Sequence, residues 1–87
     1  MSVIDNFSGM LEKVNEGFIR SNIHMVSNSL LAKALFEVKP DLQEKVIRNM
    51  SIDGAEEVKH LLEQGGITLE IADSARQEIM SMAGGYI

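Results

Sequence analysis

Apolar residues recur along this chain at intervals of three and four, which is the spacing of one face of an α-helix. The clearest case is the set Leu42, Val46, Ile47 and Met50, which lies on one helical stripe. Nowhere does strict alternation of apolar and polar residues last long enough to indicate a strand. The pattern therefore predicts an all-α fold, a compact bundle of about five to six short helices.

Residues that commonly cap or stop helices divide this pattern into segments. Pro40 suits the first turn of a helix, where its missing N–H costs no internal hydrogen bond. The expected helices are one that follows Asn15 and runs through Val26, one from Ser27 or Asn28 through Leu35, one from Pro40 to Arg48 or Asn49, one from Ser51 to Gly65, and one from Leu69 or Glu70 to about Met82.

Helices of this length are not stable alone in water, so their apolar stripes have to cover one another. A chain of 87 residues has room for one domain and one core. We expect residues 1–83 to form that domain and residues 84–87 to be a flexible tail. The last helix should bury Ile71, Ala75, Ile79 and Met82. The wider core should contain Ile23, Leu31, Leu35, Val46, Met50, Val58, Leu62 and Ile79.

Composition narrows the classes of function. Cysteine is absent and only two histidines are present, so the sequence offers no metal-ligand cluster. It also contains no phosphate-binding glycine loop and no nucleophile elbow. We therefore expect no catalytic residues, no metal and no cofactor, and a chain that is not an enzyme.

Charge is unevenly distributed along the chain. The net charge is -5, and the whole excess of acids lies after Met50. An acidic surface argues against nucleic-acid binding and suits a basic protein partner, although a solvated helix face gives the same pattern. No apolar run is long enough for a membrane span, and the first residues lack the features of a signal peptide. We expect a cytoplasmic location without membrane insertion.

The segment from Leu42 to Ser51 reads Leu-Gln-Glu-Lys-Val-Ile-Arg-Asn-Met-Ser and resembles the Leu-Arg-Glu-Lys-Ile-Leu-Arg-Asn-Met-Ser of the C-terminal domain of the flagellar motor-switch protein FliG. The segments 31–35 and 75–80 are also similar to that family, and the resemblance extends from Phe7 to Met82. It implies a compact six-helix bundle of the kind that carries torque at the cytoplasmic ring of the flagellar rotor.

Several positions depart from the family at charged side chains that face the stator. The family's lysine is Phe36 here, one arginine is Asp53, an adjacent acid pair is His60 and Leu61, and a second arginine is Thr68. We interpret this pattern as a reused scaffold, a protein-interaction module that serves as a flagellar-motor or motility-associated adaptor. Its partner would be a rotor or stator component, and self-association stays open.

The expected contact surface of this module is apolar with a charged rim. Phe36 and Leu61 supply its apolar part, unless they are buried in a slightly rearranged core. Its charged and polar residues are Asp53, Glu56, Glu57, Lys59 and His60. The alternative is a diverged rotor domain that contacts the stator through Asp53, Glu56, Glu57 and Lys59.

Overall fold

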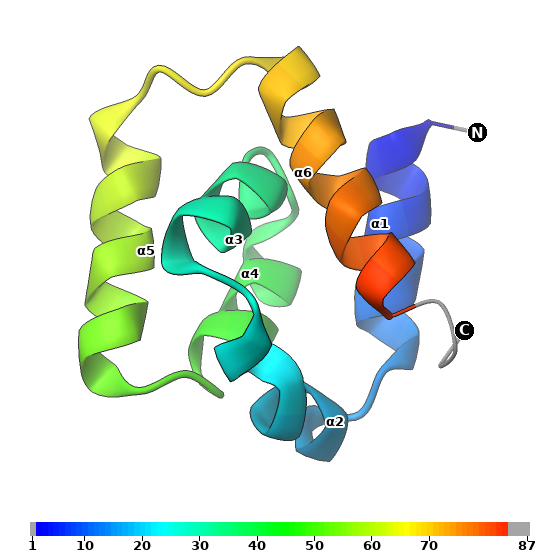
Figure 1. Ribbon diagram of the computed structural model, residues 1–87, viewed down its shortest axis with the longest axis vertical. Coiled ribbons are helices and arrows are strands. Elements are labelled where there is room, and N and C mark those ends of the chain that lie inside the picture. Colours follow the sequence, from blue (N-terminus) through cyan, green and yellow to red (C-terminus); the bar gives the residue numbers. More distant parts are fainter. Residues whose placement is uncertain (1, 84–87) are drawn as a thin grey trace.

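A computed structural model describes residues 2–83, which form helices and connecting turns without a strand (Figure 1). The all-α prediction is confirmed for this part of the chain, and residues 84–87, the predicted tail, lie outside it. No helix in residues 2–83 has both the length and the hydropathy that a membrane crossing requires. The elements are α1 (Val3–Lys13), α2 (Glu16–Asn22), the 3-10 turn η1 (Ile23–Met25), α3 (Asn28–Leu35), α4 (Pro40–Ile47), α5 (Ile52–Gln64) and α6 (Leu69–Met82).

Side-chain caps begin these helices where the sequence predicted them. The side chains of Asn15, Ser27 and Ser51 accept hydrogen bonds from backbone N–H groups in the first turns of α2, α3 and α5, at 2.7, 3.1 and 3.1 Å. Thr68 caps α6 in the same way at 3.2 Å. Gly65 ends α5 with a φ of 81°, which a residue without Cβ adopts at low cost.

Two helices differ from the expectation. The periodicity did not predict α1, which Ser2 caps by accepting from the Asp5 N–H at 3.2 Å. The helix after Asn15 stops at Asn22 and tightens into η1, so Val26 lies beyond it. The last turn of this segment is a tighter 3-10 turn. One extended residue, Val26, separates it from Ser27, the cap of α3.

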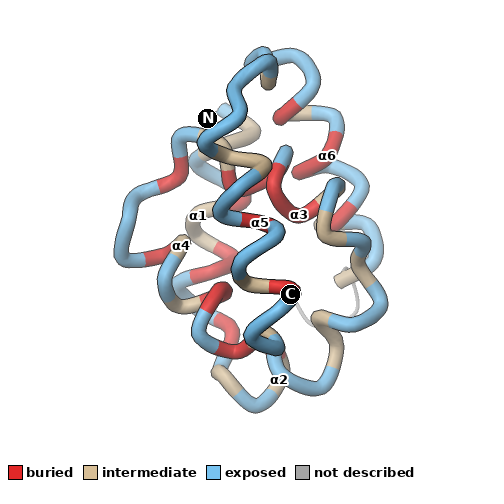
Figure 2. Tube along the Cα trace, turned by 90° about the vertical axis from the view of Figure 1, so that its left-hand side faces the viewer, coloured by how far each residue is buried: buried red, intermediate tan, exposed pale blue. Residues whose placement is uncertain are grey.

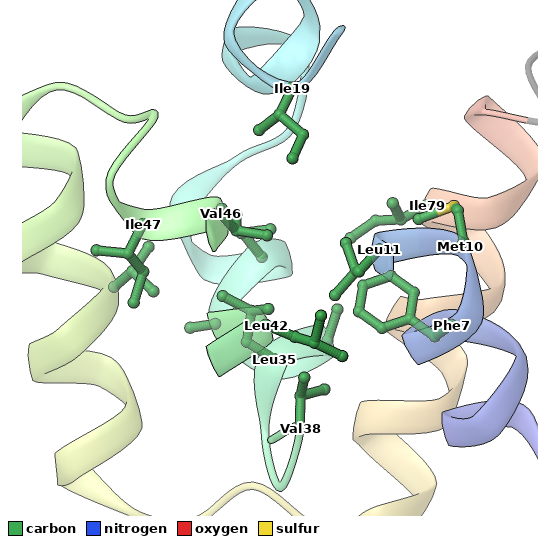
Figure 3. Close-up of a cluster of buried hydrophobic side chains, with 14 of the residues drawn as sticks. Phe7, Met10, Leu11, Ile19, Leu35, Val38, Leu42, Val46, Ile47 and Ile79 are labelled. Carbon is green, nitrogen blue, oxygen red and sulfur yellow. The ribbon is translucent and has the colours of Figure 1, made fainter. Parts of the chain in front are cut away.

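One apolar core joins the helices (Figure 3). Of the predicted core residues, Leu31, Leu35, Val46, Val58 and Ile79 are buried. Ile23, Met50 and Leu62 are only half-buried and pack against the core from its margin. The main members contributed by the first and fourth helices are Phe7, Met10, Leu11, Leu42, Val46 and Ile47.

The register predicted for α6 was wrong at two positions. Ile71 and Met82 are exposed, by 42% and 49% of their surface, whereas Ala72, Ala75 and Ile79 are buried. Ile71 precedes Ala72 by one residue, which turns it about 100° away from the packed stripe. Small residues lie on the packed face because α6 lies directly against α3.

Arg76 is fully buried between α6 and the end of α3. Its Nε donates to the Ala34 carbonyl at 2.9 Å, its Nη2 donates to the Phe36 carbonyl, and its Nη1 pairs with Asp73 at 2.6 Å. The guanidinium therefore satisfies carbonyls that α3 leaves free at its C-terminus. Glu37 follows with a φ of 62°, so the chain reverses here in a tight turn.

The helices pack around α3, which lies between α5 and α6, while α1 packs on the other side of α6 (Figure 1). Helix α5 is at the edge of the bundle, and its neighbour is α3. This position leaves most of the surface of α5 without a packed neighbour among residues 2–83.

Candidate functional site

Helix α5 buries a narrow stripe and exposes the rest of its surface. Gly54 and Val58 are its buried residues. Figure 2 looks onto α5 and shows it exposed over most of its length. Five of the predicted contact residues lie on this exposed surface, namely Asp53, Glu56, Glu57, Lys59 and His60.

The two apolar residues of the predicted contact surface lie in different places. Leu61 is half-buried on α5 and packs against the margin of the core. Phe36 is half-buried just after α3, where its carbonyl accepts from Arg76. The groove that contains Leu61 is not lined by Phe36. The structure thus joins Leu61 to the polar residues of α5 and leaves Phe36 on a separate element.

The α3 side of α5 carries two grooves. One, with a volume of about 530 Å³, lies beside the start of α5 and is lined by Asp53 and Glu57 together with the apolar residues Ile23, Val26 and Met50. The other, of about 190 Å³, lies beside the end of α5 and is lined by Leu61, Ile67 and Ile71. A hydrogen bond of 2.7 Å from Asn28 Nδ2 to Glu57 Oε1 links α3 to α5.

Sequence reasoning missed Asn28, Ile67 and Ile71 as parts of this surface. Ile71 follows the apolar spacing of α6 and was therefore expected to be buried, so nothing in the sequence indicated its exposure. No sequence signal indicated that Asn28 meets Glu57, since the two are 29 positions apart.

A polar cluster fixes the turn that leads into α5. Arg48 pairs with Glu16 through bonds of 2.9 and 2.7 Å, and buried Asn49 donates to Glu16 at 3.1 Å and accepts from Arg20 at 2.9 Å. The hydrogen bonds from Arg48 and then Asn49 lower the pKa of Glu16 to about 2. They tie α2 to the end of α4, directly before the cap of α5 at Ser51.

Within residues 2–83, no three His, Cys, Asp or Glu side chains gather closely enough to hold a metal ion. An apolar cavity of about 130 Å³ lies between α1, α2 and the end of α6, lined by core residues such as Phe7, Leu11 and Ile79, and it shares Ile23 and Val26 with the groove beside the start of α5. None of the described residues that line this cavity carries a charge.

Comparison with protein families matches residues 6–86 to the FliG C-terminal domain. The chain belongs to the FliG C-terminal domain family. The domain that defines this family is a structural domain of the flagellar motor switch, and the family is not an enzyme family. Comparison with curated proteins gives no match, and comparison with solved structures gives none.

Proposed function

We propose that this member of the FliG C-terminal domain family is a non-enzymatic protein-interaction module, an adaptor at the cytoplasmic face of the flagellar motor. The observation that carries the proposal is the edge position of α5, which leaves five charged or polar residues exposed on one helix. A rotor or stator component is the expected partner.

The proposed contact surface combines charge with apolar area. Asp53, Glu56 and Glu57 attract a basic partner over a distance of about a Debye length, near 8 Å in physiological salt. Leu61, beside Ile67 and Ile71, supplies apolar area that association would remove from water. Phe36 would add a second, smaller contact at the end of α3.

A second candidate function is a rotor domain that contacts the stator through charge alone. The observation in its favour is that Asp53, Glu56, Glu57 and Lys59 are all exposed, while Leu61 and Phe36 are half-buried. The two functions differ in what dominates the contact, which is apolar burial in the adaptor and charge pairing in the rotor domain.

The test is photo-crosslinking in the native host from a single probe residue. Glu56 on α5 is replaced by a photoreactive amino acid, and Asn6, an exposed residue of α1, is replaced in the matched control. We expect the Glu56 probe to form a crosslink to a flagellar rotor or stator protein, identified by mass spectrometry, and the Asn6 probe to form none. Identical products from both sites, or none from α5, would overturn the proposal.

A further inference from the structure

Three residues on the α3 side of α5 define what a partner has to present. Asp53, Glu57 and Leu61 recur every four residues and line the two grooves described above. We call them the α5 stripe. Its acidic end and its apolar end are eight residues apart, a separation of about 12 Å along the helix axis.

The acidic end of the stripe suits one long basic side chain. The groove there has apolar walls at Ile23, Val26 and Met50, against which the methylene stem of a lysine or arginine can lie. Asp53 and Glu57, one turn apart on α5, also line this groove. Glu57 already accepts one bond, from Asn28, which holds its carboxylate in place and leaves its second oxygen for a cation.

The apolar end of the stripe suits one aliphatic side chain. Leu61, Ile67 and Ile71 line the smaller groove, and Ala32 lies among its other lining residues. Ile71 is 42% exposed, so a partner that covered it would remove apolar surface from water. Lys33 also lines this groove, and its positive charge disfavours a second cation there. The two ends of the stripe therefore prefer different side chains.

We propose that the α5 stripe binds a helical segment of a protein partner that carries a lysine or arginine and, seven or eight residues away, a leucine, isoleucine or methionine. The inference rests on the proposed function and adds the chemistry and spacing of the partner. Two helical turns on the partner match the two turns between the ends of the stripe. Charge complementarity selects the basic residue, and the groove selects the aliphatic one.

The test uses two alanine-rich helical peptides of identical composition as probes. One places an arginine and a leucine eight residues apart, and the other places them two residues apart, which puts them on different sides of the helix. Binding to the full chain is followed by backbone amide shifts in NMR. We expect the first peptide to bind at least fivefold more tightly and to shift the amides of Glu57 and Leu61.

Variants of the chain locate the contact. Asp53→Asn and Leu61→Ala should each weaken the first peptide about tenfold, while Glu63→Gln on the outer face of α5 should leave its affinity unchanged. Thermal melts establish that each variant is folded, and Asp53→Asn keeps the test open if Leu61→Ala unfolds, because Asp53 is exposed.

Two outcomes would overturn the inference. One is equal affinity for the two peptides, and the other is a shift pattern centred on Glu56, His60 and Glu63 instead of the stripe. Either result leaves the crosslinking test from Glu56 unaffected. Conversely, loss of the crosslink with normal peptide selectivity would overturn the proposed function alone.

Discussion

Arg76 connects two helices through backbone carbonyls. The guanidinium is fully buried and donates to the carbonyls of Ala34 and Phe36, both at the end of α3, while its charge is balanced by Asp73 on its own helix. Buried charges persist in proteins when they are paired and hydrogen-bonded in this way. Arg76 therefore fixes the position of α6 relative to the turn that contains Phe36.

Replacing Arg76 by methionine tests this role. The variant keeps an unbranched side chain but leaves the carbonyls of Ala34 and Phe36 without their donor. Each unsatisfied carbonyl should lower the free energy of unfolding by about 1 to 3 kcal/mol. We expect Arg76→Met to lower the free energy of unfolding by about 2 to 6 kcal/mol in a urea titration, a large part of the stability of a small domain. Gln77→Met, on the exposed side of the same helix, is the control. Equal stability of the two variants would contradict the role of Arg76.

Single residues also show where sequence reasoning stops. Asn15, Ser27, Ser51 and Thr68 were predictable as caps, because capping depends on the residues directly beside the helix start. The burial of Arg76 was not predictable, since an arginine is normally exposed and the carbonyls that accept from it lie about 40 positions away. The same holds for Ile71, whose exposure depends on where α3 meets α6.

At the scale of elements, the pair Glu16 and Arg48 joins α2 to the end of α4. Asn49 adds bonds to Glu16, to Arg20 and to the Lys45 carbonyl at 2.7 Å, so it closes both the end of α4 and the contact with α2. Arg48 and Asn49 of the Arg-Asn-Met-Ser segment therefore have a structural role, because their side chains hold α2 against the end of α4. Ser51 then starts α5 from a fixed position.

This cluster predicts a specific response to acid. The pKa of Glu16 is about 2 in the folded chain, below its ordinary value of 4.5, so folding favours the ionised form. The stabilisation is fully present above about pH 4.5 and is lost as the pH falls toward 2. We expect Glu16→Gln to have a thermal midpoint that depends less steeply on pH across this window than that of the unchanged chain.

Arg48 provides the matched comparison for that measurement. Arg48→Gln should flatten the same part of the pH profile, since it removes the main cause of the lowered pKa of Glu16. The double variant should be as flat as Glu16→Gln alone, because Arg48 acts on this part of the profile through Glu16. Parallel profiles for all four proteins would show that the pair does not shape acid stability.

The order and type of most helices could be predicted from periodicity and caps, but their arrangement could not. Each apolar stripe indicates that a helix is covered on one side, and does not indicate by which neighbour. That α5 lies at the edge, with α3 as its neighbour, decides which of its residues are available for contact. The first helix escaped prediction although Phe7, Met10 and Leu11 follow helical spacing.

For the molecule as a whole, charge is separated by position in the chain. Acids and bases balance as far as Met50, and the excess of five negative charges lies beyond it. Because α5 is at the edge of the bundle, part of this excess faces outward as Asp53, Glu56, Glu57 and Glu63. The uneven charge was evident in the sequence. Only the fold shows that part of this charge is concentrated on the exposed surface of α5, a helix at the edge of the bundle, with Leu61 at its margin.

The salt dependence of binding should separate the adaptor from the rotor domain. With the partner identified by crosslinking, Glu56→Lys is compared with Glu12→Lys, an exposed residue of α1 that changes the net charge equally. We expect Glu56→Lys to slow association several-fold at low salt and to lose this effect near 1 M salt, where the Debye length falls to about 3 Å. Glu12→Lys should have little effect at either salt concentration.

Leu61→Ala completes the comparison, because apolar burial is not screened by salt. In an adaptor whose contact depends on Leu61, this variant should weaken binding about tenfold, or about 1.4 kcal/mol, at both low and high salt. In a rotor domain that depends on charge, Leu61→Ala should bind normally and the unchanged chain should lose its partner in 1 M salt. Calorimetry on the same variants, with a thermal melt for each, distinguishes the two functions. The adaptor requires weaker binding by Leu61→Ala at both salt concentrations, and the rotor domain requires normal binding by Leu61→Ala and loss of the partner in 1 M salt.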